Sequence, residues 1–180
     1  ADIVDLTLHD FLSKTGKNVI IATGMATLGE IEEVMSLYPD KEKITLIHCV
    51  SNYPCSIESL NLKAMQTLTH AFSVNVGYSD HSIGPLAATL SVALGASVVE
   101  KHFTLDRNLP GPDHNASLEP NELKFMVKSI RNIEKALSGS KIKEPSKSEL
   151  KNKKIIRKSI IALKPIAKGE IFNKSNIGTK

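Results

Sequence analysis

Short runs of apolar, β-branched residues alternate with longer amphipathic stretches between residues 18 and 137. Each short run is apolar on both faces, which is typical of strands buried in a parallel sheet. The longer stretches repeat apolar residues at the spacing of one helix face. The pattern predicts strands over residues 18–23, 44–50, 74–79 and 97–103, and helices over residues 28–37, 57–71, 85–95 and 121–137.

The alternation of strands and helices predicts an α/β protein built from βα units. Thr27 and Glu30 form a capping-box pattern at the start of one predicted helix, and Gly95 is suited to end another. A shorter helix over residues 6–14 precedes the first strand. The units could form a small doubly wound sheet or half of an eight-stranded barrel, and periodicity alone does not separate these two folds.

Composition narrows the class of protein. The 180 residues are 41% hydrophobic and 23% charged, which excludes extended disorder and collagen-like or coiled-coil structure as the main interpretation. No apolar run reaches the roughly 20 residues that span a bilayer, and the acidic N-terminus is unlike a signal peptide, so we expect a cytoplasmic protein. Cys49 and Cys55 are too few for a disulfide framework and are expected to be reduced thiols near a core strand.

The net charge of +4 is concentrated in one segment. Residues 141–158 hold eight Lys or Arg and two Glu, so the remainder of the chain is slightly acidic. This segment contains no aromatic residue, whereas single-strand nucleic-acid surfaces combine basic and aromatic side chains. A solvated, extended linker is therefore favoured over a nucleic-acid-binding arm.

Polar residues gather at the carboxyl ends of the predicted strands, the edge at which parallel sheets bind ligands. His81 and His102 end two consecutive strands. Period-two alternation places Ser79 beside His81 on one face, and Glu100 beside His102. Two imidazoles suit Mn²⁺, Fe²⁺ or Zn²⁺ acting as a Lewis acid. From spacing alone, hydrogen-bonded strand-end histidines remain the alternative, since no HExxH or CxxC pattern is present.

Other strand-end residues have a binding and a structural interpretation. Thr23, Ser79 and the Gly24 amide are suited to hold phosphate, although ordinary turns also use them and no Walker or GxGxxG loop is present. Tyr53, followed by proline, is a candidate sugar-facing wall or a packing residue. Asp113 is a candidate hydroxyl acceptor or the start of an Asx-type turn.

Three further histidines and one cysteine are assigned to structural roles. His48 and Cys49 lie within an apolar strand and are predicted to be core residues. His9 and His70 lie in predicted helices and are expected at the helix surface.

Five motifs together resemble the sialic acid synthase family: TGMAT (residues 23–27), HCVSNYP (48–54), GYSDHSIG (77–84), EKHFTLD (100–106) and GPDHNASLEP (111–120). The resemblance covers residues 1–139 and resumes with RKSIIALKPIAKGE. It implies the C-terminal part of a TIM (β/α)8 barrel over residues 1–139, a basic linker over 140–154 and the start of a small β-rich antifreeze-like (SAF) domain over 155–180. The first residues are interpreted as the end of a strand, and both ends of the chain resemble truncations of a longer protein.

The resemblance also implies an activity. Members of the family condense phosphoenolpyruvate with N-acetylmannosamine or a related N-acetylated hexosamine, giving a nonulosonic (sialic) acid and phosphate. A divalent metal, Mn²⁺ or Mg²⁺, polarises the open-chain aldehyde for attack by C3 of phosphoenolpyruvate, after which water adds at C2 and phosphate leaves by C–O cleavage. The full-length protein is expected to be a homodimer without nucleic-acid or membrane partners.

The resemblance implies a role for each matched residue. His81 and His102 match the metal ligands, and Ser79 matches a serine that contacts phosphoenolpyruvate. Glu100, the acidic neighbour of the second ligand, and Asp2, near the sugar aldehyde, are the expected catalytic acids. The remaining substrate-binding residues are Thr23, Ser51, Tyr53 and Asp113.

Two positions depart from the family pattern. Ala22 stands where many members have a phosphate-binding Ser, and Ser51 stands where some have Asn. Legionaminate or pseudaminate synthases, a non-catalytic carbohydrate-binding relative and a metal-dependent hydrolase remain alternatives. The family's Lys and Ser before residue 1, and the Arg of a partner's antifreeze-like domain, lie outside the chain, so the isolated 180 residues are expected to be inactive.

Overall fold

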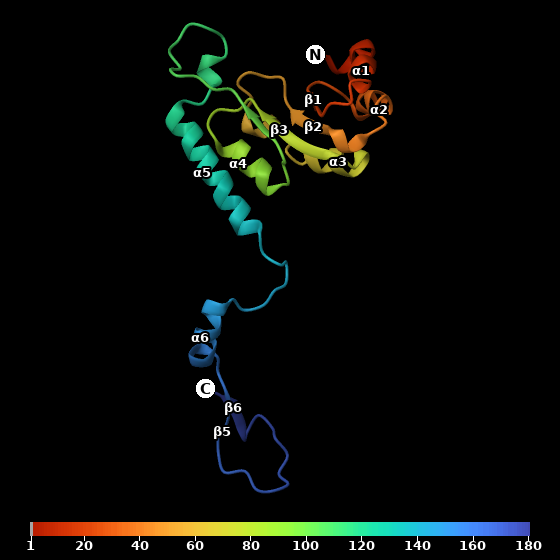
Figure 1. Cartoon of the computed structure of the whole chain (residues 1–180). Coiled ribbons are helices and arrows are strands. Elements are labelled where there is room, and N and C mark those ends of the chain that lie inside the picture. Colours follow the sequence, from red (N-terminus) through yellow and green to blue (C-terminus); the bar gives the residue numbers. More distant parts are fainter. Residues whose placement is uncertain (1) are drawn as a thin grey trace. The chain divides into compact units, whose positions relative to one another are not determined.

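Four parallel strands form the centre of the first of two units in a computed structural model that describes residues 2–180 (Figure 1). Their order in the sheet is their order in the sequence. Each strand pairs in parallel with the next, as βα crossovers require. The strands are β1 (Val19–Ala22), β2 (Ile44–Cys49), β3 (Asn75–Asp80) and β4 (Val99–Lys101). The prediction of a parallel α/β sheet is confirmed.

Helices connect the strands and follow the last of them (Figure 1). Thr27 caps the second helix with its hydroxyl, and the Glu30 carboxylate accepts from the Thr27 backbone N–H, so the predicted capping box is present. Gly95 follows the fourth helix with φ of 103°, a conformation that glycine adopts without steric cost. The helices are α1 (Leu6–Ser13), α2 (Leu28–Ser36), α3 (Ala64–Phe72), α4 (Leu86–Ala93) and α5 (Pro120–Leu137).

Two local predictions were wrong. The helix expected over residues 57–71 is instead a short 3-10 turn, η3 (Ile57–Ser59), followed by α3. Asn61 separates them because its φ of 43° lies in the left-handed region, which interrupts a right-handed helix. The first residues, interpreted as the end of a strand, form the 3-10 turn η1 (Asp2–Val4), while residue 1 lies outside the described residues.

The main hydrophobic core lies between the sheet and the first three helices. Leu46 and Tyr78 come from adjacent strands and are almost completely buried, as are Val34 of α2 and Met65 of α3. A second cluster, built on Leu118 and Met126, joins α4 to α5. Figure 1 shows α5 running alongside α4. This packing fixes the carboxyl ends of β3 and β4, where the candidate site lies.

Residues 140–180 form the second unit. It contains α6 (Lys147–Ile156) and an antiparallel pair, β5 (Ile160–Ala162) with β6 (Ile177–Thr179). The basic segment expected as an extended linker is therefore partly helical, because Ser146 and Glu149 form a capping box that starts α6. Assignment of this unit to an antifreeze-like domain stays a prediction. Within residues 2–180, no helix is both long enough and apolar enough to cross a membrane.

Candidate functional site at the carboxyl edge of the sheet

The imidazoles of His81 and His102 lie next to each other at the ends of β3 and β4. Asp80 of β3 pairs with Lys101 of β4, so the two histidines that follow emerge side by side. Their ring centroids are 5.5 Å apart and the rings are nearly perpendicular. The structure thus brings together the two residues predicted as metal ligands.

A backbone carbonyl orients the His81 ring. Nδ1 of His81 lies 2.7 Å from the carbonyl oxygen of Val50, which can only accept a hydrogen bond. Nδ1 is therefore the protonated nitrogen of the neutral ring, in which Nε2 has the lone pair. This backbone contact is the arrangement that commonly orients histidine ligands in metal sites.

Ser79 and Glu100 lie on the same face of the sheet as the histidines. The Ser79 hydroxyl donates to Oε1 of Glu100 over 2.7 Å, and its oxygen is 3.3 Å from Nε2 of His81. The two residues are paired in the β3–β4 register, so their placement follows from strand alternation. A hydroxyl, a carboxylate and an imidazole nitrogen thus converge beside His102.

Tyr53 lies over both imidazoles. Its ring centroid is 4.1 Å from that of His81 and 5.5 Å from that of His102, and the residue is 50% exposed. Partial burial raises the pKa of the Tyr53 phenol, and nearby negative charge adds to this effect. The phenol therefore stays protonated at neutral pH and remains a hydrogen-bond donor to whatever binds beside the histidines.

Asp113 reaches the site from the loop after β4. Its Oδ2 lies 3.8 Å from Nδ1 of His102, and its side chain is mostly exposed. The Asp113 carbonyl accepts hydrogen bonds from the Ala116 amide and the Ser117 hydroxyl. The turn is therefore made by the backbone of Asp113 and not by an Asx-type bond of its side chain, and the carboxylate lies beside the second histidine.

The residues after β1 that were predicted to bind substrate or phosphate lie less close together. The Thr23 hydroxyl is buried and donates to the Ile47 carbonyl over 3.0 Å, and Thr23 lines a separate cavity of about 370 Å³ with His48. Ser51 instead lies against Gly24, where an added Cβ would come within 2.4 Å of the serine oxygen. Ser51 is thus beside the Gly24 backbone, whereas the Thr23 hydroxyl is already used within the fold.

Asp2 lies apart from this cluster. It lines a pocket beside β1 with Leu8, Ile20 and Ala22. Its assignment as an acid near the sugar aldehyde stays a prediction. The same pocket contains Ala22, the position expected to depart from the family pattern.

The donor set fits a metal site that is completed by other ligands. The His81 and His102 rings lie 5.5 Å apart, and two imidazoles are suitable ligands for Mn²⁺. Within residues 2–180, no group of three or more His, Cys, Asp and Glu side chains is close enough to hold one ion. A metal held here would need water or substrate for its remaining positions.

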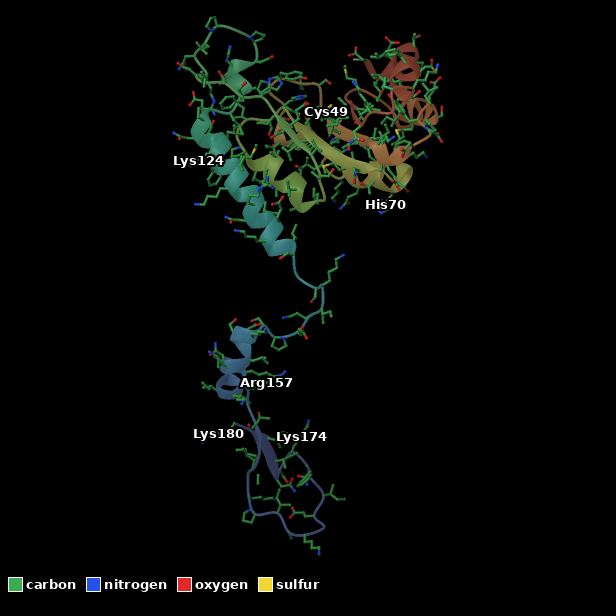
Figure 2. The ribbon with its side chains drawn as sticks, in the orientation of Figure 1. Cys49, His70, Lys124, Arg157, Lys174 and Lys180 are labelled. Atoms are coloured by element: carbon green, nitrogen blue, oxygen red, sulfur yellow. The ribbon has the colours of Figure 1, made fainter. Side chains whose placement is uncertain are left out.

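Sequence reasoning missed one buried feature and misplaced one histidine. Asp80 and Lys101 form a buried ion pair on the face opposite the histidines, a pairing that only the strand register reveals. His9, expected at a helix surface, is 4% exposed because Nδ1 bonds the hydroxyl of Tyr38, 29 residues away. The other helix histidine, His70, is exposed on α3 as predicted (Figure 2).

The two cysteines agree with expectation. Both are free and buried, and Cys49 lies at the carboxyl end of β2 (Figure 2). Burial raises the pKa of both thiols. The neighbouring His48 is half-buried, with Nε2 2.9 Å from the Leu60 carbonyl. His48 thus has a structural partner, whereas Cys49 pairs with Ser79 in the register of β2 and β3 and lies next to the site.

The fold and the site together define an α/β protein with a parallel half-barrel and paired histidines at its carboxyl edge. The chain belongs to the NeuB family, whose model matches residues 1–143. The resemblance to the sialic acid synthases is thereby confirmed at the level of the family.

Three similar proteins show how far the likeness extends. An N,N'-diacetyllegionaminic acid synthase of Campylobacter jejuni is 51% identical over 99% of this chain and 54% of its own length. A pseudaminic acid synthase of the same species is 41% identical over 92% of this chain and 48% of its own. The solved structure of an N-acetylneuraminic acid synthetase from Leptospira borgpetersenii, in complex with citrate, is 40% identical, with a TM-score of 0.77 over 86% of this chain and 54% of that one. The chain spans about half the length of the curated relatives it matches.

Proposed function

We propose that the full-length protein condenses phosphoenolpyruvate with an N-acetylated hexosamine aldehyde, giving a nonulosonic acid and phosphate. The observation that carries this proposal is the pair of adjacent imidazoles at the carboxyl edge of a half-barrel in a NeuB-family chain. The names of the similar proteins support the same class of reaction.

In the proposed reaction, C3 of phosphoenolpyruvate forms a bond to the aldehyde carbon, whose oxygen takes up a proton. Water adds at C2, and the C2–O bond to the phosphate then breaks, so phosphate leaves with no change in overall oxidation state. His81 and His102 would hold Mn²⁺, which would supply Lewis-acid polarisation of the aldehyde.

The other residues position the substrates. The Ser79 hydroxyl, held by Glu100, is placed to contact phosphoenolpyruvate, and Glu100 is a carboxylate suited to move a proton beside the second histidine. Tyr53 forms a wall over the imidazoles, and the exposed carboxylate of Asp113 is free to accept a sugar hydroxyl. Fixing both reactants in one geometry is a large part of such catalysis.

The similar proteins favour an acceptor with two acetamido groups. The diacetyllegionaminic acid synthase has higher identity than either the pseudaminic or the N-acetylneuraminic acid enzyme named above. We therefore place a diacetamido-hexose first among the acceptors and keep N-acetylmannosamine as the alternative. Assays with both sugars, at equal concentration, separate them by kcat/KM.

The test is phosphate release by the full-length protein with phosphoenolpyruvate, each acceptor and Mn²⁺. His81→Ala and His102→Ala should each lower the rate at least about a hundredfold, since loss of a metal ligand removes several kcal/mol of transition-state stabilisation. His70→Ala, at an exposed position on α3, is the matched control and should keep the wild-type rate.

No Mn²⁺-dependent release with any N-acetylated hexosamine would contradict the proposal. It would favour a carbohydrate-binding relative without activity. Ala22→Ser would then be the first substitution to test for a gain of phosphate release. Sugar binding measured by calorimetry identifies that alternative directly.

A further inference from the structure

A buried ion pair lies directly behind the two histidines. Asp80 is fully buried and the Lys101 side chain is 2% exposed, with Nζ 3.0 Å from Oδ2 of Asp80. Removing two charges from water costs several kcal/mol per ion, and their attraction offsets this cost only when the geometry is good and the remaining hydrogen bonds are made. The pair therefore needs a closely defined set of partners.

Those partners are present. Oδ1 of Asp80 accepts from the Ser82 amide at 2.8 Å and from the Ser82 hydroxyl at 2.7 Å, and the Tyr78 hydroxyl lies 3.4 Å away. The Lys101 ammonium also donates to the Ser82 carbonyl. Burial raises the pKa of Tyr78, so its phenol stays a donor to the carboxylate. Few orientations of the two side chains satisfy all these contacts.

The residues that the ammonium group contacts flank His81 in the sequence. Asp80 and Ser82 stand immediately before and after His81, and the Lys101 ammonium binds both of them. Lys101 itself immediately precedes His102. One ammonium group thus binds the side chain of the residue before His81 and the backbone of the residue after it, and it belongs to the residue that precedes His102.

We propose that Asp80 and Lys101 are positioning residues that set the separation and direction of the His81 and His102 imidazoles. The inference rests on the proposed function in one respect, the binding of Mn²⁺ by these histidines. Neither charged group touches metal or substrate. Their effect passes through the backbone at the ends of β3 and β4, where the distance between the two ligands is decided.

The experiment compares Mn²⁺ affinity in the full-length protein, measured by titration with electron paramagnetic resonance of free Mn²⁺, and thermal stability measured in EDTA. The test variant combines Asp80→Asn with Lys101→Met, because the amide oxygen can still accept from Ser82 and no charge is left unpaired. The matched control combines Asp10→Asn with Lys14→Met at an exposed ion pair on α1.

We expect the test variant to bind Mn²⁺ about 10–100-fold more weakly, the loss typical of groups that orient metal ligands, while the control binds as wild type does. A merely structural pair would change only the melting temperature of the metal-free protein. Unchanged Mn²⁺ affinity in the folded test variant would therefore overturn the inference.

Two other outcomes of the Mn²⁺ titration also decide between these interpretations. If the test variant does not fold, Lys101→Arg replaces it, since arginine keeps the charge but presents a planar fork in place of a compact ammonium. Wild-type Mn²⁺ affinity in that variant would also overturn the inference. If wild type itself binds no Mn²⁺, the metal site of the proposed function is wrong. If wild type and variants bind Mn²⁺ equally well, only the positioning role of the ion pair is wrong.

Discussion

Three histidines of this chain differ in the partner of their Nδ1 nitrogen. At His81 the partner is a backbone carbonyl, which leaves Nε2 on the side of the Ser79 hydroxyl. At His9 the partner is a tyrosine hydroxyl in a buried contact. His70 bonds a carbonyl one turn earlier in its own exposed helix. The same side chain is therefore a candidate ligand, a core residue or a surface residue.

The thiols of Cys49 and Cys55 should react slowly in the native protein. Burial raises the pKa of both groups, so the reactive thiolate is scarce at neutral pH, and reactivity should rise only as pH approaches the raised values. We expect reaction with Ellman's reagent at pH 7.5 to be more than about tenfold slower in native than in urea-unfolded protein. Equal rates in the two states would contradict this prediction.

Single residues show where prediction from sequence stops. The shared face of Ser79, His81, Glu100 and His102 follows from period-two alternation alone, because side-chain direction in a strand is a local property. The burial of His9 does not follow, because Tyr38 is brought to it by packing of a different element. Local rules place a side chain on a face, and only tertiary packing supplies what covers it.

At the scale of elements, Gly77 in β3 leaves no room for a side chain between its neighbouring strands. A Cβ built there would meet the Val98 carbonyl oxygen at 2.6 Å and Cγ2 of Ile47 at 2.7 Å. That carbonyl accepts the Tyr78 amide, so it cannot move without loss of a ladder hydrogen bond. The β3–β4 contact thus depends on the absence of a side chain at this position.

Gly77→Ala should accordingly destabilise the protein by about 1–3 kcal/mol, the usual cost of overpacking. Gly29→Ala is the matched control, because nothing lies within 4 Å of its Cβ position in α2 and alanine is the better helix former. We expect the control to be neutral or up to about 1 kcal/mol more stable. Urea unfolding of the full-length proteins measures both, and equal stabilities would contradict the prediction.

Element prediction succeeded where hydrophobic period and end signals agreed. The capping box at Thr27 and the glycine after α4 mark helix ends that the structure reproduces within one or two residues. The stretch over residues 57–71 contains no such signal, and its apolar residues are shared between η3 and α3. Asn61 between them has a left-handed backbone conformation, and the spacing of apolar residues does not predict such a conformation.

On the scale of the whole molecule, β1 and β4 are the edges of the four-stranded sheet. Open strand edges present unpaired backbone groups that readily join other strands. Since the curated relatives are about twice as long, we expect the remainder of the full-length protein to cover these edges.

The isolated 180 residues should therefore release no phosphate above background with phosphoenolpyruvate, Mn²⁺ and either acceptor. The full-length protein at the same molar concentration is the positive control. Measurable product from the isolated chain would show that four strands suffice and would overturn the expectation. Its circular dichroism spectrum, recorded in parallel, separates loss of folding from loss of catalytic groups.

The buried pair of Asp80 and Lys101 also bears on how the sheet assembles. If β4 docked one residue out of step, alternation would turn Lys101 away from Asp80 and would turn His102 away from the face that carries His81. An uncompensated buried charge costs several kcal/mol, so such misaligned intermediates would be short-lived. The ion pair thus favours the correct strand register during folding, and only in that register do the two imidazoles lie next to each other.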